Sequence, residues 1–361
     1  MSDIFFKKEN PERFSDLWDV LAKDLNGGPR MTRLGLKYFF TLAEERGLED
    51  DRSFILTQSG IPVAGALVPI GRLGKDRVVT MAGEYVLAPL ARNDSARKEV
   101  FGIIDVQARD AGAVKALIAF DALRPEPYNY LHSFGYLDTS LITYIYDLTL
   151  PGDFLSHCEK NHRRSLREIL DDKRFTVIRI DREHPDRTHH ENHERLHEKC
   201  SGRKTRSTRT FDVHYEQLLA GEAVLFCVLF EGKPAAYGYF QHAQGRAHYS
   251  STSDDPDITG YPMQHLLTYY ATEYYRGLGI KAILPGEPSS PSPQFDYFPD
   301  EKSLHIANFK NRFGGAYRPL YRGVRYYKDS AIQTDVKKFG EEYARALDTY
   351  EKGKKKTTGS L

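Results

Sequence analysis

Two stretches of the chain consist of a pair of apolar runs that flank a short turn. Residues 53–68 have the sequence SFILTQSGIPVAGALV, and residues 224–240 have the sequence VLFCVLFEGKPAAYGYF. In each stretch a Gly-x-Pro step, at Gly60 and at Gly232, separates runs that are rich in strand-forming residues, and such a pattern is typical of a β-hairpin. The pattern therefore predicts one hairpin in each half of the chain.

The same series of elements follows both hairpins. The apolar pattern predicts a third strand, then a helix that ends near a glycine, then a short strand and a Phe-Gly step. In the first half these elements cover residues 77–82, 95–111, 115–118 and 134–135, and in the second half residues 246–251, 261–276, 281–284 and 313–314. Their recurrence in one order predicts an α/β protein built by internal duplication, with helices packed on mixed sheets. Two unrelated α/β domains that share common turns are the alternative.

This organisation divides the chain into two domains and a C-terminal extension. We expect the first domain at residues 1–150, the second at 151–330 and the extension at 331–361. A Pro-Gly step within residues 147–153 marks the linker, and a helix over residues 154–171 is expected to bridge the halves. Apolar residues at three- and four-residue steps predict an amphipathic helix over residues 332–351, and we expect the basic tail that follows to be disordered.

Composition and charge narrow the class of protein. The chain has 361 residues, 40% of them hydrophobic, with a formal net charge of +1, so contact with nucleic acid would rely on local basic clusters. Cys158, Cys200 and Cys227 form no CxxC pair, which favours a reducing compartment. The N-terminus has no apolar segment of signal-peptide length, and the longest apolar run, Ala223–Phe230, is too short to span a bilayer. We therefore expect a cytoplasmic protein, and the oligomeric state stays open.

Three stretches carry a resemblance to a known family. They are FLSHCEKNHRRSLREILD at residues 154–171, the hairpin and strand from Val224 to Asp254, and NFKNRFG at residues 308–314. In this doubled order they resemble the Fem-type aminoacyltransferases, which have a tandem acetyltransferase-like (GNAT) fold and take amino acids from aminoacyl-tRNA. The resemblance implies two GNAT-like domains without a coiled-coil arm, since residues 181–211 are too few for one. Residues 285–303 have no counterpart in the family pattern, so the acceptor is expected to differ.

The NFKNRFG segment holds the strongest candidate for catalysis. Attack of an amine on an activated ester turns the carbonyl oxygen into an oxyanion, which needs a charged or hydrogen-bonding donor. The resemblance implies that Lys310 supplies this charge, with Phe309, Arg312 and Phe313 forming the substrate site around it. From the residues alone, a surface lysine beside a hydrophobic contact is the alternative.

Other candidates lie on the predicted bridging helix, on a basic loop and after the third strand of the second half. Arg163, Arg164 and Arg167 share one predicted helix, where such a group can bind acceptor phosphates. Asp254 is a candidate to accept the proton of the amine, with Tyr249 beside it, although a turn-forming aspartate is the alternative. Residues 202–210, GRKTRSTRT, contain no acid and suit a tRNA backbone, or form a solvated loop, and their basic residues are Arg203, Lys204, Arg206 and Arg209.

The prediction of the acyl donor rests on a glycine-rich turn that this sequence lacks. GNAT enzymes that use acetyl-CoA carry a glycine-rich turn that holds the pyrophosphate at a helix start. The corresponding residues 254–264, DDPDITGYPMQ, contain only Gly260. We therefore predict aminoacyl-tRNA as co-substrate, a small-molecule amine as acceptor and no bound cofactor. An acyl-CoA N-acyltransferase is the first alternative, and a non-catalytic binder of an anionic glycan or nucleotide is the second.

One motif matches a zinc-binding pattern but is not expected to bind zinc. His193-Glu194-Arg195-Leu196-His197 matches the H-E-x-x-H pattern, which on a helix places two histidines on one face for zinc. The neighbouring residues are almost all polar, unlike those of a buried metalloprotease helix, and Cys200 stands where the longer zinc motif has glycine. We therefore predict no metal site.

Overall fold

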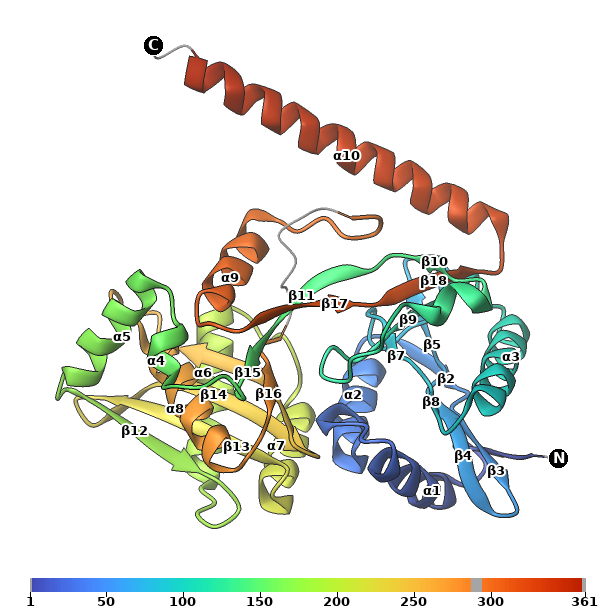
Figure 1. Ribbon diagram of the computed structural model, residues 1–361, viewed down its shortest axis with the longest axis horizontal. Coiled ribbons are helices and arrows are strands. Elements are labelled where there is room, and N and C mark those ends of the chain that lie inside the picture. Colours follow the sequence, from blue (N-terminus) through green and yellow to red (C-terminus); the bar gives the residue numbers. More distant parts are fainter. Residues whose placement is uncertain (1, 287–293, 359–361) are drawn as a thin grey trace.

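The computed structural model describes residues 2–286 and 294–358. The first half places a strand and two helices before a hairpin, and a helix between two further strands (Figure 1). Its elements are β1 (Asp3–Phe6), α1 (Pro11–Asp24), a 3₁₀ turn (Pro29–Met31), α2 (Arg33–Glu45), β2 (Leu48–Asp51), β3 (Phe54–Gln58), β4 (Ile61–Ala66), β5 (Pro69–Leu73), β6 (Asp76–Val79), β7 (Val86–Leu87), β8 (Leu90–Ala91), α3 (Asp94–Asp110), β9 (Lys115–Ala119), a second 3₁₀ turn (Tyr130–Phe134) and β10 (Leu137–Asp138).

The second half repeats this order and adds a long helix at its end. Its elements are β11 (Leu141–Asp147), α4 (Phe154–His157), α5 (Lys160–Asp171), β12 (Phe175–Ile180), α6 (Arg187–Ser201), α7 (Thr208–Ala220), β13 (Ala223–Phe230), β14 (Lys233–Ala243), β15 (Arg246–Asp254), α8 (Met263–Gly277), β16 (Ala282–Leu284), α9 (Glu301–Asn311), β17 (Ala316–Leu320), β18 (Arg322–Tyr326) and α10 (Asp329–Thr358).

The two predicted hairpins occupy equivalent places. Strands β1, β3 and β4 are neighbours in one antiparallel sheet, as are β12, β13 and β14 in another. Each hairpin turns through a non-glycine residue and a glycine that both have positive φ, 51° and 78° at Ser59-Gly60 and 51° and 79° at Glu231-Gly232, which matches strand twist in a two-residue turn. In both halves a strand that precedes the long helix pairs in parallel with the strand after that helix, β6 with β9 across α3 and β15 with β16 across α8. The predicted duplication is confirmed.

Strands are exchanged between the halves. Strand β11 follows the first half in sequence, yet it lies between β16 and β17 in the sheet of the second half. Strand β18, near the end of the chain, lies between β9 and β10 in a sheet of the first half. The continuous pairs β10–β11 and β17–β18 therefore form an antiparallel ribbon across both halves (Figure 1). The division at residue 150 stays a prediction. Strand β11, which precedes residue 150, pairs within the second half, and strand β18, which follows it, pairs within the first half.

Each half has its own large apolar core. In the first half Phe14, Trp18 and Leu21 of α1 pack against Phe54 and Ile55 of β3. In the second half α8 and α5 cover the sheet around β13 and β14. Helices α2 and α7 pack together and join the halves on one side of the molecule.

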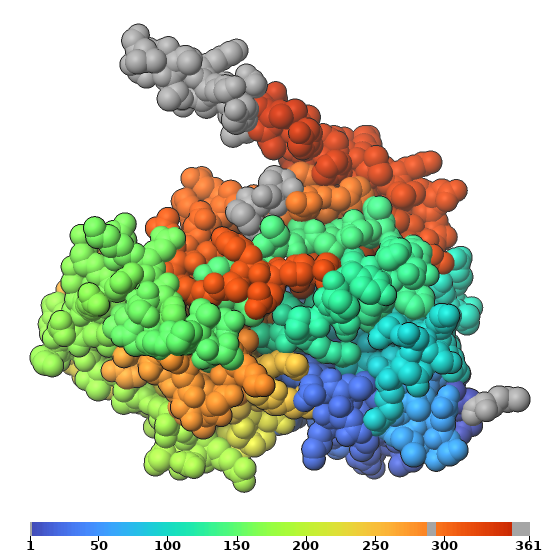
Figure 2. Space-filling view, viewed as in Figure 1, coloured from blue at the N-terminus to red at the C-terminus, as the bar shows by residue number. Residues whose placement is uncertain are grey.

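The helix predictions differ from the structure at two points. The helices expected at residues 95–111 and 261–276 form as α3 and α8. The bridging helix expected at residues 154–171 is broken, because Cys158 has an extended backbone and separates α4 from α5. The final helix starts at Asp329 and continues to Thr358, so the tail expected to be disordered is helical as far as it is described, and residues 359–361 lie outside the described residues. Beyond its first turns α10 projects from the body (Figure 2).

Candidate active site between parting strands

Lys310 lies where two parallel strands separate. Strands β15 and β16 pair only from Arg246 to His248, and β15 then continues alone beside β14 to Asp254. Helix α9 brings Lys310 to this point, and the Lys310 Nζ donates a hydrogen bond to the backbone carbonyl of Gly286 at 3.2 Å. A lysine ammonium therefore stands at the mouth of the gap between the two strands.

Gly286 fits this place because it has no side chain. Its φ is +80°, in the left-handed region that favours glycine, and a Cβ would lie 3.1 Å from the carbonyl oxygen of Tyr249 and 3.6 Å from the Lys310 Nζ. A larger residue would press on both groups. The strand, the glycine and the lysine thus form one close-packed unit.

Aromatic rings and histidines hold the C-terminal end of α9. The rings of Phe309 and Phe313 meet edge to face with centroids 5.0 Å apart, and Phe313 is fully buried. His162 of α5 and His265 of α8 pack on both rings, at centroid distances between 4.9 and 5.6 Å. The predicted pair of aromatics around Lys310 therefore contacts two other helices as well.

Charged groups from both halves meet beside this unit. The Arg30 Nη2 lies 3.3 Å from the Asp121 Oδ1, in an ion pair whose arginine and aspartate side chains are 20% and 6% exposed. The charge of Arg30 with the Leu123 amide holds the pKa of Asp121 below its usual value although burial opposes this. On the second half, burial together with the charges of Arg30 and Lys310 lowers the pKa of His248 to about 3. His248 is therefore neutral at pH 7, and it lies in the field of Lys310 and of the first half.

The predicted proton acceptor and its tyrosine lie apart from each other. The Tyr249 hydroxyl donates to the Gln264 Oε1 at 2.8 Å, its ring stacks on Phe240, and burial raises the pKa of Tyr249. Asp254 lies at the far end of β15 and accepts a hydrogen bond from the Cys200 thiol at 3.4 Å. Tyr249 lies next to Gly286, whereas Asp254 contacts Cys200 of α6.

The three arginines of the bridging helix have different surroundings. The Arg163 Nη2 donates to the Cys158 carbonyl at 3.0 Å and so binds the backbone where α4 ends. Arg164 is exposed and lies 3.7 Å from Glu168, and Arg167 is exposed as well. Arg312 lies 3.6 Å from Glu159 at the start of α5. Of the three helix arginines, Arg164 and Arg167 are exposed whereas Arg163 binds the backbone, so the group predicted to bind acceptor phosphates is split between two environments.

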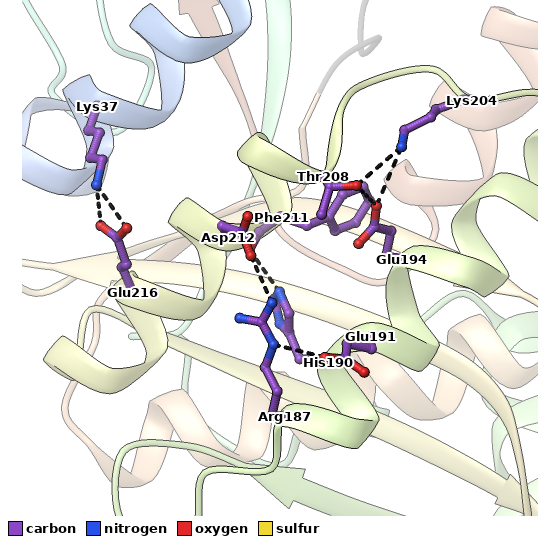
Figure 3. Close-up of polar contacts among 10 residues, drawn as sticks. All are labelled: Lys37, Arg187, His190, Glu191, Glu194, Lys204, Thr208, Phe211, Asp212 and Glu216. Carbon is purple, nitrogen blue, oxygen red and sulfur yellow. Dashed lines mark hydrogen bonds and ion pairs between the residues drawn. The ribbon is translucent and has the colours of Figure 1, made fainter.

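The basic loop between α6 and α7 makes specific contacts. The Lys204 Nζ donates to the Thr208 hydroxyl at 3.1 Å and lies 3.8 Å from Glu194, so the loop is tied to the helix before it (Figure 3). Arg209 forms an ion pair of 2.8 Å with Glu44 of α2. Arg203 is exposed. Most of this loop therefore has protein partners.

Arg206 points into the molecule. It donates to the hydroxyls of Tyr38 and Ser251 and lies over the ring of Phe211 at 4.2 Å. Because Tyr38 belongs to α2 and Ser251 to β15, Arg206 bridges the two halves. It was predicted to bind tRNA, and its placement gives it a structural partner on each side instead.

The H-E-x-x-H motif lies in a buried cluster of rings. Both ring nitrogens of His193 are 3.1 Å from serine hydroxyls, those of Ser253 and Ser251, and burial lowers its pKa well below the usual value. The His197 ring meets that of His193 edge to face with centroids 6.2 Å apart. Among residues 2–286 and 294–358, no group of three or more metal-capable side chains is found.

The chain is similar to a known protein family and to several solved structures. Residues 156–289 match the family described as acetyltransferase (GNAT) domain. Among solved structures, FemX is similar, with a TM-score of 0.60 and 15% identity over 85% of this chain and 95% of that chain. The chain has a tandem GNAT-like fold.

Two further structures share this tandem GNAT-like fold. The C-terminal domain of a putative lysylphosphatidylglycerol synthetase from Agrobacterium fabrum has a TM-score of 0.59 and 16% identity, over 91% of this chain and 95% of that chain. L-PGS from Bacillus licheniformis has a TM-score of 0.58 and 17% identity, over 93% and 97%. No curated protein matches the chain significantly by sequence.

Sequence reasoning missed the residues that meet from opposite halves. Asp121 follows β9 and His248 lies in β15, and nothing in the local pattern links them. Their shared signal is their position at the end of a parallel pair of strands in each copy of the duplicated unit.

In the part of the chain that the structure describes, none of the helices combines the length and apolarity needed to cross a bilayer.

Proposed function

We propose that the protein is an aminoacyltransferase that moves an amino acid from aminoacyl-tRNA to an amine and forms an amide. The observation that carries the proposal is Lys310, an ammonium group held at the gap between β15 and β16 of a GNAT-like unit. A cation fixed there is placed to stabilise the oxyanion that forms when an amine attacks the donor ester. In this step the C–N bond forms, the ester C–O bond breaks, and the ribose hydroxyl gains the proton that the amine loses.

The charge at the start of α8 supports a donor other than coenzyme A. Asp254, Asp255 and Asp257 precede this helix, and Lys199 pairs with the last two at 2.5 and 2.7 Å. A helix start that binds pyrophosphate presents free backbone amides and glycines, whereas carboxylates repel phosphate. In this proposal the exposed Arg164 and Arg167 bind acceptor phosphates, and the exposed Arg203 of the α6–α7 loop contacts tRNA.

The competing function is acyl-CoA N-acyltransfer on the same fold. It is favoured by the match of residues 156–289 to the acetyltransferase (GNAT) domain family. Both functions use Lys310 and differ only in the donor, so the test varies the donor. A purified amine acceptor is supplied either with charged tRNA or with acyl-CoA, and a parallel sample receives ribonuclease. Transfer that ribonuclease abolishes supports the proposal, and transfer from acyl-CoA that ignores ribonuclease overturns it.

A protein that only binds its ligand is the third possibility to test. Lys310→Ala removes the ammonium group while leaving Phe309 and Phe313 in place. Loss of transfer with retained binding of the acceptor identifies an enzyme. If the unmodified protein binds the acceptor but transfers nothing from either donor, the proposed catalysis is wrong.

A further inference from the structure

A tight turn precedes helix α9 and leads directly into it. The backbone amides and carbonyls of Gln294 and Tyr297 exchange hydrogen bonds of 2.9 and 3.0 Å, and Asp296 between them has a φ of +64°. Few residues other than glycine adopt this left-handed conformation, which persists where neighbouring groups hold it in place. The groups that contact Asp296 therefore show what the turn is attached to.

Asp296 is bound by residues that lie with the first half. Arg322, in the interior strand β18, is 7% exposed, and its Nη2 donates a hydrogen bond to the Asp296 Oδ1 at 2.7 Å. The Arg322 Nε donates to the backbone carbonyl of Thr139 at 2.6 Å, and its guanidinium lies over the ring of Tyr85, 4.6 Å from the centroid. The Tyr85 hydroxyl donates a second hydrogen bond to Asp296. Two donors, from β18 and from the residue before β7, therefore hold the carboxylate.

Helix α10 also contacts the turn. Phe295 and Phe298 pack on Phe339 of α10, with ring centroids 5.5 and 5.7 Å apart. One turn earlier in α10, Asp335 forms an ion pair with Lys115 of β9, which attaches the start of α10 to the same sheet of the first half. The turn therefore lies between α10 and this sheet (Figure 1).

The turn fixes the start of α9, and Phe313 fixes its end. Asp300, at the N-cap, accepts a hydrogen bond at its Oδ1 from the Ser303 amide at 2.7 Å. Only one of the residues within α9 is buried, so the helix itself has few anchors. Phe313, just beyond the helix, is fully buried in the core of the second half. Helix α9, which carries Lys310, is thus attached to the first half at one end and to the second half at the other.

We infer that Asp296 is a positioning residue for Lys310, and that it acts by tying the start of α9 to Arg322 of the first half. The inference rests on the proposed function, in which Lys310 is the catalytic cation. It adds that the position of this cation in the second half depends on a contact made with the first half. An ion pair removed from water adds little net stability, but its geometry is directional. A catalytic group displaced by about 1 Å can lose on the order of a hundredfold in rate.

The test removes the carboxylate while keeping the backbone of the turn. Asp296→Gly accepts the positive φ without a side chain, and Asp296→Asn keeps the shape and one acceptor but loses the charge. In the transfer assay with charged tRNA, we expect Asp296→Gly to lower kcat between about ten- and a hundredfold with KM changed less than twofold, and Asp296→Asn to restore part of that rate. Asp212→Asn is the matched control, because it breaks an exposed pair of 2.8 Å with Arg187 in the second half and should leave kcat unchanged (Figure 3).

Hydrogen exchange of the protein alone supplies a second readout. The amides of α9 should exchange at least about fivefold faster in Asp296→Gly than in the unmodified protein, and less so in Asp296→Asn, while those of β13 and α8 keep their rates. Unchanged exchange in α9, or a kcat equal to that of the control, overturns the inference. If Asp296→Gly does not fold, the same two criteria decide on Asp296→Asn. If Lys310→Ala is fully active while α9 still exchanges faster in the Asp296 variants, the proposed function fails and the attachment of α9 to the first half stands.

Discussion

Lowering the pH should destabilise this protein because several of its buried histidines are neutral in the folded state. We develop the prediction for His265. Burial, with a smaller contribution from His162, lowers the pKa of His265 to about 4, whereas a histidine in an unfolded chain titrates near about 6.5. Because the folded pKa lies below the unfolded one, the unfolded chain binds more protons as the pH falls from about 6.5 towards 4. The stability contributed by neutral His265 is therefore complete above pH 6.5 and is lost through this window.

The size of the effect follows from the two pKa values. At pH 5 nearly all unfolded chains but only about a tenth of folded ones carry a proton on this histidine, which amounts to about 2 kcal/mol of lost stability relative to pH 7. His197, whose pKa is also about 4, adds a smaller amount because its ring is more exposed. Carboxylates contribute chiefly below this range, so the interval from pH 7 to pH 5 isolates the histidines.

Urea unfolding followed by circular dichroism at pH 7, 6 and 5 measures the effect. Replacing His265 by glutamine removes the titrating group, so the stability lost between pH 7 and pH 5 should shrink by about 2 kcal/mol relative to the unmodified protein. The exposed His184, replaced in the same way, should leave that loss unchanged. An identical pH dependence in His265→Gln, with an unchanged slope against urea, would refute the reasoning.

Three further predictions concern catalysis, backbone geometry and the donor. Lys310→Ala should lower kcat on the order of 10²–10³-fold with little change in Tm, and near-normal turnover would contradict its role. Gly315→Ala should unfold at a clearly lower temperature, because its φ is +148° and a Cβ would lie 2.1 Å from the Ile145 carbonyl oxygen, whereas Gly340→Ala in open space should not; equal Tm values would count against this. If the basic loop binds tRNA, log affinity should fall against log salt with a slope of about −3, and replacing Arg203, Lys204 and Arg209, while keeping the structural Arg206, should flatten that slope; a slope that stays the same would place tRNA elsewhere.

The hairpins and the two helices after them could be predicted because their signals are local. Glycine at a two-residue turn and apolar spacing along a helix act within a few residues. The break at Cys158 was missed, since the helical pattern of residues 154–171 runs through it and the Arg163 contact to its carbonyl appears only in three dimensions.

The candidate site was predictable only in part. The NFKNRFG segment pointed to Lys310, and the structure adds Gly286, which accepts a hydrogen bond from Lys310, and His162 and His265, which pack on Phe309 and Phe313. Arg206 was grouped with its basic neighbours by sequence, yet its partners Tyr38 and Ser251 lie far from it along the chain. Contacts between distant segments depend on how the sheets assemble, and charge spacing does not encode them.

The exchanged ribbon has a consequence for how the chain is made. Strand β18, an interior strand of a first-half sheet, is synthesised after strands β11–β17, so that sheet waits for residues 322–326 before its neighbours β9 and β10 are joined. Synthesis therefore reaches the end of the second half before the first can close. A chain released early would expose the edge of β9, which is a ready partner for other strands. The first-half sheet is thus completed only after the strands of the second half have been made.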